Sequence, residues 1–236
     1  TPGADSFVVS RELLAASFRT VCGYSVHTHQ NEIREGFVTL RGGHRAGVCG
    51  TCVGGENGPT GIRDISSLNI RVAREVFGAG DRAVEEFYAC RRGVLLAGPP
   101  CSGKTTVLRD MARQISSGCR GSICKVALVD ERGELSGAYD CFDLGENTDV
   151  FRMCRKADGL KMMIRSMAPM VAAVDEIGGA DDVEAIEYAS KCGVSVIATI
   201  HGDDPKKDVD SKILSCFRCI VRLSDQCGQI REIVNV

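Results

Sequence analysis

Short continuous runs of apolar residues recur from Gly93 to the C-terminal end of the chain. They read VLLAG, KVALVD, MVAAVDE, VSVIATI and CIVRL, and helical or glycine-containing segments separate them. Continuous rather than alternating runs are typical of strands that are buried on both faces, as in a parallel sheet covered by helices. The pattern predicts a doubly wound α/β domain over residues 91–236.

The pattern of the N-terminal part is different. Residues 10–23 predict a helix, and residues 36–42 and 46–55 predict two strands joined by a hairpin-like turn. These elements indicate a small α+β domain over residues 1–90. Because the chain begins with Thr rather than Met, we expect this domain to be partial.

Two more helices are predicted at the end of this N-terminal domain. The first covers residues 62–78 and the second covers residues 81–91. Over the first segment, apolar side chains recur at helical spacing, namely Ile65, Leu68, Val72 and Val76. We place the domain boundary after the second helix, near residue 90.

Charge and composition narrow the class of protein. The 236 residues carry 29 basic and 31 acidic side chains, a net charge of −2, with no Trp and four Tyr. Nucleic-acid binding depends on basic surfaces and on aromatic side chains that stack on bases, so this composition argues against it. No apolar run approaches the ~20 residues that span a bilayer, so we expect a soluble protein without a transmembrane segment.

The chain has thirteen cysteines. Most lie in apolar stretches and predict reduced thiols in the core of a cytosolic protein. Two CxxC pairs, Cys49/Cys52 and Cys216/Cys219, offer four ligands of the type that structural zinc takes. Both pairs fall in predicted strands, where residues i and i+3 point to opposite faces, so we favour strand positions over a zinc site.

The segment GPPCSGKTT carries the clearest chemical signal. It matches G-x-x-x-x-G-K-[ST], the Walker A motif, and stands between the predicted strand VLLAG and a predicted helix. In such a loop the backbone N–H groups wrap the phosphates, the lysine reaches the β- and γ-phosphates, and the hydroxyl binds Mg²⁺. The predicted ATP-binding residues of the loop are Gly98, Pro99, Pro100, Cys101, Ser102, Gly103, Lys104, Thr105 and Thr106.

A second signal is the acidic pair that ends MVAAVDE. Asp175 follows four apolar residues at a predicted strand end, the Walker B arrangement, and we expect it to bind Mg²⁺ together with Thr105. Glu176 is the expected base that polarises the attacking water. Another predicted strand, KVALVD, lies between the phosphate loop and this pair. That order is typical of RecA-like P-loop ATPases with an additional strand and a catalytic glutamate.

Two other predicted strands end in polar groups. VSVIATIHG places Thr199 and His201 one helix after the acidic pair, where a polar side chain can sense or position the γ-phosphate. VDERGE places Glu131 and its charged neighbours at a further strand end, and ligands collect at this edge of open α/β sheets. A role beside the nucleotide and a plain charged loop both stay open for the second cluster.

The order of these motifs, with Arg165 and Pro169 before the acidic pair, resembles the secretion and pilus ATPase superfamily. Within it, stretches such as GPPCSGKTTVLRDMAR, VALVDERGE and VDEIGGADDVEAIEYASKCGVSVIATIHG resemble the stage III sporulation protein AA family more closely. The resemblance covers about residues 23–202. It implies a ring-forming, hexameric ATPase at the cytoplasmic side of a membrane. Such a ring would energise a secretion-like channel between mother cell and forespore and dock on a membrane-embedded partner.

The resemblance also implies roles for single residues. Glu131 falls at the acidic-box carboxylate and His201 at the histidine-box residue, which makes Lys104, Glu131, Glu176 and His201 the predicted catalytic set. An arginine from the N-terminal domain or from a neighbouring subunit completes such sites. The candidates are Arg41, Arg45, Arg63, Arg71 and Arg74.

Two positions depart from the superfamily pattern. Cys101 stands where many relatives carry Gly, and Met170 stands where secretion ATPases often carry an acid. Neither change removes a predicted catalytic group.

Two other functions stay open. One is a RecA-like ATPase that remodels nucleic acid, which requires a basic path that the net charge does not indicate. The other is a scaffold that holds ATP without hydrolysing it, and the intact Lys104, Asp175 and Glu176 argue against that function.

Overall fold

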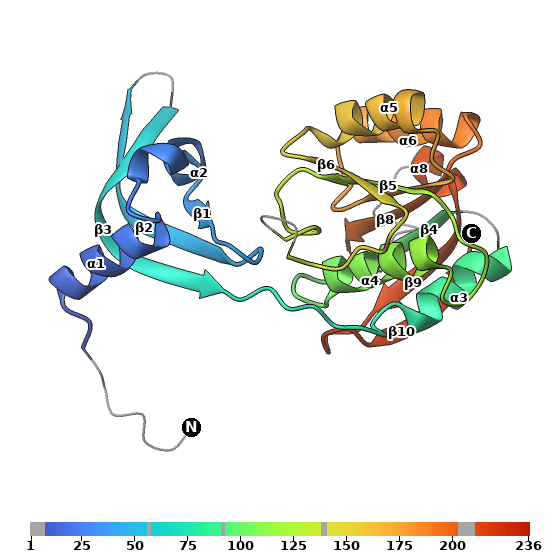
Figure 1. Cartoon of the computed structure of the whole chain (residues 1–236), viewed down its shortest axis with the longest axis horizontal. Coiled ribbons are helices and arrows are strands. Elements are labelled where there is room, and N and C mark those ends of the chain that lie inside the picture. Colours follow the sequence, from blue (N-terminus) through green and yellow to red (C-terminus); the bar gives the residue numbers. More distant parts are fainter. Residues whose placement is uncertain (1–7, 56–57, 91–92, 138–140, 203–210) are drawn as a thin grey trace, which may run out of the picture. The chain divides into compact units, whose positions relative to one another are not determined.

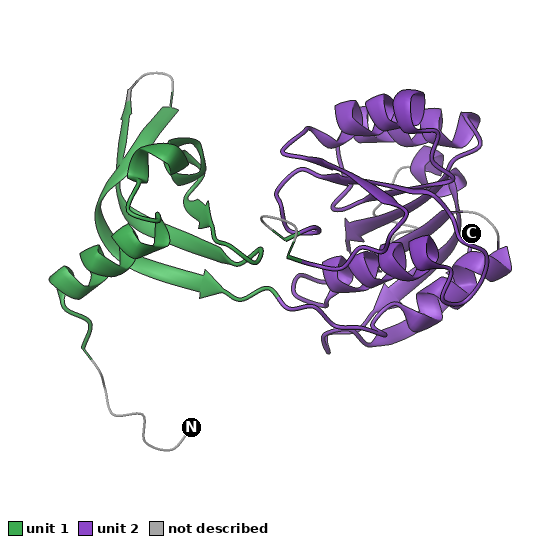
Figure 2. Cartoon of the chain, in the orientation of Figure 1, with its two compact units in different colours: residues 1–73, 137–141 green, residues 74–136, 142–236 purple. Residues whose placement is uncertain are grey.

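The computed structural model describes residues 8–55, 58–90, 93–137, 141–202 and 211–236 (Figure 1). The chain divides into two compact units, which Figure 2 shows in different colours. Unit 1 comprises residues 1–73 and 137–141, and unit 2 comprises residues 74–136 and 142–236. Among the helices that the structure describes, none is both long and apolar enough to cross a membrane.

Unit 1 is a small α+β unit with a three-stranded antiparallel sheet in the order β1-β2-β3. Its elements are α1 (Arg11–Val21), η1 (Val26–His29), α2 (Gln30–Arg34), β1 (Phe37–Thr39), β2 (Arg45–Gly55) and β3 (Gly58–Arg71). The hydroxyl of Ser10 caps α1 by accepting a hydrogen bond from Leu13 N–H, 3.2 Å away. The core of the unit is formed by Cys22, Ile33, Val38 and Val48.

The helix predicted over residues 62–78 is wrong. This segment forms most of β3, and the residues that follow Arg71 up to Glu75 have no regular structure. The cause is a bulge, because the register shifts where Thr51 pairs with Arg63 and Cys49 pairs with Ser67. The extra residues allow side chains three positions apart on one strand to pack against the same core, which imitates helical spacing. These side chains are Ile62, Ile65 and Leu68.

Unit 2 contains a seven-stranded sheet in the order β10-β9-β4-β8-β7-β5-β6. Its strands are parallel except for β10, which runs antiparallel to β9 at one edge. The strands are β4 (Gly93–Gly98), β5 (Val126–Asp130), β6 (Thr148–Arg152), β7 (Val171–Val174), β8 (Ser195–His201), β9 (Phe217–Leu223) and β10 (Ile230–Asn235). The helices are α3 (Asp81–Cys90), α4 (Lys104–Ser117), α5 (Lys156–Met167), α6 (Ala180–Lys191) and α8 (Ser211–Ser215).

Helices cover both faces of this sheet, as the continuous apolar runs predicted (Figure 1). Helices α3 and α4 pack on one face through a core that includes Phe87, Met111 and Leu128. Helices α5 and α6 pack on the other face, where the core includes Leu160 and Ile186. The α/β fold predicted from the sequence is confirmed.

Helix α3 packs in the core of unit 2, although the sequence assigned it to the N-terminal domain. Its buried side chains Ala83, Val84 and Phe87 contact the same core as α4. The division between the units therefore falls after Ala73, whereas the sequence placed it near residue 90.

The two CxxC pairs lie in different units. Cys49 and Cys52 are exposed on β2, whereas Cys219 is buried on β9. Burial raises the pKa of the Cys219 thiol to about 12. In the part of the chain that the structure describes, no group of three His, Cys, Asp or Glu side chains is arranged to hold a metal ion.

Candidate functional site

The sequence-predicted polar residues gather at the carboxyl edge of the unit 2 sheet. Four adjacent strands, in the order β4-β8-β7-β5, end at this edge. Gly98 ends β4 and leads into the phosphate loop, His201 ends β8, Asp175 follows β7, and Asp130 ends β5. Gly98 and His201 are 103 positions apart in sequence, yet they are directly paired on the neighbouring strands β4 and β8.

The phosphate loop has the backbone shape that the motif requires. Gly103, the residue before α4, has a φ of 93°, and a Cβ atom there would lie 2.8 Å from the backbone nitrogen of Gly228. Cys101 also has a positive φ, 63°. The hydroxyl of Ser102 is buried and has no hydrogen-bond partner among the described residues. A buried polar atom without a partner at this position fits a loop that receives a ligand.

Lys104 is buried at the start of α4. Its Nζ donates hydrogen bonds to the carbonyl oxygens of Gly98, at 2.8 Å, and Pro99, at 2.7 Å. Burial lowers the pKa of Lys104, although the nearby charges of Asp175 and Glu176 act in the opposite direction. The ammonium group is therefore held inside the curve of the loop.

Asp175 forms the centre of a hydroxyl and carboxylate cluster. Thr105 Oγ1 donates to its Oδ2 at 2.8 Å, and Thr199 Oγ1 donates to its Oδ1. Burial raises the pKa of Asp175, and the two hydrogen bonds oppose this rise. Carboxylate and hydroxyl oxygens are the ligands that Mg²⁺ takes beside nucleotide phosphates, so Thr105 and Asp175 fit this ion.

Glu176 has a left-handed backbone, with a φ of 57°. Its N–H donates to Thr199 Oγ1 at 2.7 Å, and its Oε1 accepts from His201 Nε2 at 2.6 Å. Its Oε2 accepts from Arg132 Nη1 at 2.6 Å. Burial alone would raise the pKa of Glu176, but the hydrogen bond from His201 and the charges of Arg132 and Lys156 outweigh it and lower the pKa.

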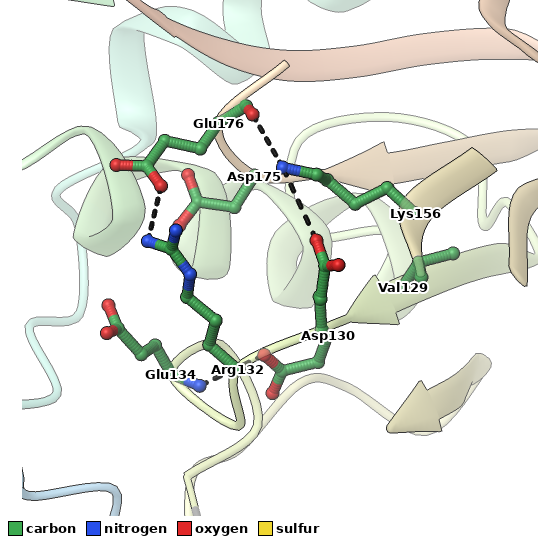
Figure 3. Close-up of a pocket in the computed structure, with 8 residues that line it drawn as sticks. Val129, Asp130, Arg132, Glu134, Lys156, Asp175 and Glu176 are labelled. Atoms are coloured by element: carbon green, nitrogen blue, oxygen red, sulfur yellow. Dashed lines mark hydrogen bonds and ion pairs between the residues drawn. The ribbon is translucent and has the colours of Figure 1, made fainter. Parts of the chain in front are cut away.

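A small pocket lies beside Asp175 and Glu176, lined also by the loop that follows β5 (Figure 3). The buried carboxylate of Asp130 shapes this loop by accepting hydrogen bonds from the N–H groups of Glu134 and Ser136. Glu131 lines the pocket and pairs with Lys156, with 3.5 Å between Oε2 and Nζ. The predicted cluster at this strand end therefore lies beside the acidic pair.

The sequence places Arg132 in the charged cluster that follows KVALVD, but two other basic residues, Lys156 and Arg109, were missed. Arg132 and Lys156 both contact Glu176, the first at its carboxylate and the second at its backbone carbonyl, 2.7 Å away. Arg109 is buried in α4 and donates to the carbonyl oxygens of Arg74, Glu134 and Leu135. No motif marks Lys156.

The five candidate arginines fall into both units. Arg74 lies in unit 2, where its carbonyl is bound by Arg109. The other candidates lie in unit 1, namely Arg41, Arg45, Arg63 and Arg71.

Two residues of the predicted phosphate loop lie apart from this network. Cys101 is exposed, and Thr106 lines a separate pocket with Arg109.

The fold is similar to that of solved secretion and pilus ATPases. The crystal structure of the ATPase DotB from Yersinia pseudotuberculosis matches with a TM-score of 0.62 at 17% identity, over 91% of this chain and 64% of that one. The structure of the pilus retraction motor PilT with bound ADP matches with a TM-score of 0.54 at 20% identity, over 83% of this chain and 61% of that one. The chain therefore shares the fold of the ATPase DotB and of the pilus retraction motor PilT.

Sequence comparison identifies the family. The model of the family "Sporulation stage III, protein AA" matches residues 1–234. Stage III sporulation protein AA of Bacillus subtilis (strain 168) is 44% identical over 184 residues, which are 76% of this chain and 60% of that protein. The chain belongs to the Sporulation stage III, protein AA family, and it spans about 60% of the length of this curated relative. A more distant relative, Protein SEEDLING PLASTID DEVELOPMENT 1 of Arabidopsis thaliana, is 27% identical over 176 residues, 72% of this chain and 25% of that protein.

Proposed function

We propose that this chain is a Mg²⁺-dependent ATPase. The observation that carries the proposal is the continuous network from Thr105 through Asp175 and Thr199 to Glu176 and His201, directly beside the phosphate loop. This network holds a pair of acidic side chains at the edge where an α/β sheet binds its ligand. The fold, shared with the ATPase DotB of Yersinia pseudotuberculosis, supports the same function.

The residues divide the reaction among them. The N–H groups of the loop and Lys104 bind the phosphates, and Thr105 and Asp175 hold Mg²⁺, which neutralises charge on the phosphate oxygens when bound. Glu176 takes a proton from water as the water oxygen attacks the γ-phosphorus, and the bond from that phosphorus to the ADP oxygen breaks. His201 fixes one oxygen of the Glu176 carboxylate through the hydrogen bond between Nε2 and Oε1.

We further propose that the chain acts as a ring, a homo-hexamer, that energises a secretion-like channel during endospore formation. Membership of the sporulation family and the fold of secretion ATPases support this role. The ring would lie in the cytoplasm and bind the membrane through a membrane-embedded partner. Because active sites of such rings form between subunits, the rate per subunit should rise with protein concentration.

Replacement of Glu176 by Gln tests the assigned chemistry. The amide keeps the shape of the side chain but cannot accept the proton, so we expect ATP turnover to fall by about 10²- to 10⁴-fold while ATP still binds. Phosphate release measures turnover, and equilibrium binding of a fluorescent ATP analogue measures affinity. The matched control is Glu187→Gln, a partly exposed acid of α6 that pairs with Lys191. Unchanged turnover in Glu176→Gln would show that Glu176 is not the base.

A further inference from the structure

Both oxygens of the Glu176 carboxylate are engaged. His201 Nε2 lies 2.6 Å from Oε1, and Arg132 Nη1 lies 2.6 Å from Oε2. A carboxylate that accepts two such hydrogen bonds is a weaker proton acceptor than a free one. Each oxygen keeps one free acceptor site for water, and loss of either partner would make the carboxylate a stronger proton acceptor.

Arg132 is not buried, and neither is His201, since their side chains are 53% and 50% exposed. Glu176 is the one carboxylate that Arg132 pairs with among the described residues. Half-exposed ion pairs of this kind contribute at most about 1 kcal/mol, so exchange for a stronger anion is favourable. Arg109 offers a contrast, because it is buried and bound to three carbonyl oxygens that fix it in place.

The position of Arg132 suits a phosphate ligand. It lines the same pocket as Asp175 and Glu176, and Figure 3 shows it reaching toward these acids from the loop after β5. Lys156, the other cation of this pocket, is bound to the backbone of Glu176 and to Glu131. A guanidinium group binds phosphate oxygens with two parallel N–H donors, which makes a triphosphate a stronger partner than one carboxylate oxygen.

We propose that Arg132 changes its partner from Glu176 to the terminal phosphate of a bound nucleoside triphosphate. The exchange removes the hydrogen bond on Oε2 of Glu176 only when a third phosphate is present. Arg132 would thus discriminate ATP from ADP and couple triphosphate binding to release of the base. The inference rests on the proposed ATPase function and adds a specificity-determining residue to it.

Nucleotide binding tests the exchange without relying on turnover. Affinities for ADP and for a non-hydrolysable ATP analogue, both with Mg²⁺, are measured for the full chain and for Arg132→Ala. In Arg132→Ala we expect the affinity for the triphosphate to fall by roughly tenfold or more, because the variant loses hydrogen bonds to a charged group. The affinity for ADP should change by less than about twofold. The matched control is Arg155→Ala, an exposed arginine paired with Asp181, which should change neither affinity.

A double-mutant cycle separates exchange from general electrostatics. In Glu176→Ala, Arg132 no longer has a carboxylate to leave, so the triphosphate should bind several-fold more tightly. In the Arg132→Ala background the same change should have a much smaller effect. Thermal unfolding of all variants shows whether they fold.

The outcomes distinguish this inference from the proposed function. Equal losses for ADP and the triphosphate in Arg132→Ala, or no loss, would overturn the exchange while leaving ATP hydrolysis standing. The exchange would also be overturned if Glu176→Ala changed triphosphate affinity equally in the wild-type chain and in Arg132→Ala. A wild-type chain that binds neither nucleotide would overturn the proposed function and the exchange together.

Discussion

Two residues other than glycine adopt left-handed backbone conformations within the site, Cys101 and Glu176. This conformation costs about 1–2 kcal/mol for a residue with a Cβ atom, so surrounding contacts must hold it. At position 101 glycine would adopt it at no steric cost, which gives a physical reason for the glycine that superfamily relatives often carry there. At Glu176, hydrogen bonds fix both sides of the residue, its N–H to Thr199 and its carbonyl to Lys156.

Lys156→Met should separate the positioning of Glu176 from the binding of ATP. The substitution keeps the length of the side chain but removes the hydrogen bond to the Glu176 carbonyl and the pairing with Glu131. Displacement of the carboxylate by a fraction of an ångström should lower the turnover number by roughly 10- to 100-fold, with little change in ATP affinity. Steady-state hydrolysis and equilibrium ATP binding measure the two quantities.

Lys161→Met is the control for this variant, because Lys161 lies on the same helix and pairs with the exposed Glu184. It should hydrolyse ATP at the wild-type rate. An equal loss in both variants would indicate a general effect on α5, and a wild-type rate in Lys156→Met would show that the Glu176 backbone needs no support.

The sequence identified residues that stand at fixed spacing within a motif. Lys104 and Thr105 belong to a contiguous loop, and Asp175 and Glu176 end an apolar run, so local context was sufficient. Lys156 lies 20 residues from Glu176 and begins a helix after an edge strand, so only the folded sheet brings it to the site. Contacts of this kind depend on strand order, which a single sequence does not specify.

At the scale of elements, burial decided which strands could be predicted. The five central strands of unit 2 are enclosed by helices on both faces and read as continuous apolar runs. The edge strands β6 and β10 are only partly buried, with sequences TDVFR and IREIVN, and they gave no such signal. The error at β3 has a different cause, because its bulge produced helical spacing within a strand.

The bulge in β3 requires a glycine on the opposite strand. A Cβ atom at Gly50 would lie 2.6 Å from the carbonyl oxygen of Arg63 and 2.8 Å from Cγ2 of Ile62. Gly50→Ala should therefore push β2 and β3 apart and destabilise unit 1 by about 1–3 kcal/mol. Native-state hydrogen exchange of the β2 and β3 amides measures this loss without assuming that both units unfold together.

Gly61→Ala provides the matched control for the bulge. Gly61 lies on β3, and a Cβ atom there would meet no atom within 4 Å, so exchange rates should stay close to those of the wild-type chain. Faster exchange in both variants would point to a general intolerance of the hairpin. Unchanged exchange in Gly50→Ala would mean that the bulge rearranges without cost.

At the scale of the whole molecule, the residues of the proposed reaction are distributed over both units. The network around Asp175 and Glu176 lies in unit 2, whereas unit 1 carries four of the five candidate arginines. The charge of −2 leaves no overall basic field, so an arginine would act through a specific position rather than through general attraction. In a ring, such a residue can reach the site of the same subunit or that of its neighbour.

Alanine substitution of each candidate, followed by mixing of variants, distinguishes these two arrangements. Loss of an arginine that stabilises the transferring phosphoryl group should lower turnover by about 10³-fold or more, so at least one variant among Arg41, Arg45, Arg63, Arg71 and Arg74 should show this loss. Mixing that variant with Glu176→Gln creates, in a mixed ring, some sites with both an intact Glu176 and an intact arginine. Recovery of phosphate release on mixing requires that the arginine act between subunits. Loss without recovery would place it within one subunit, and five variants with wild-type turnover would contradict the expectation that any of these arginines completes the site.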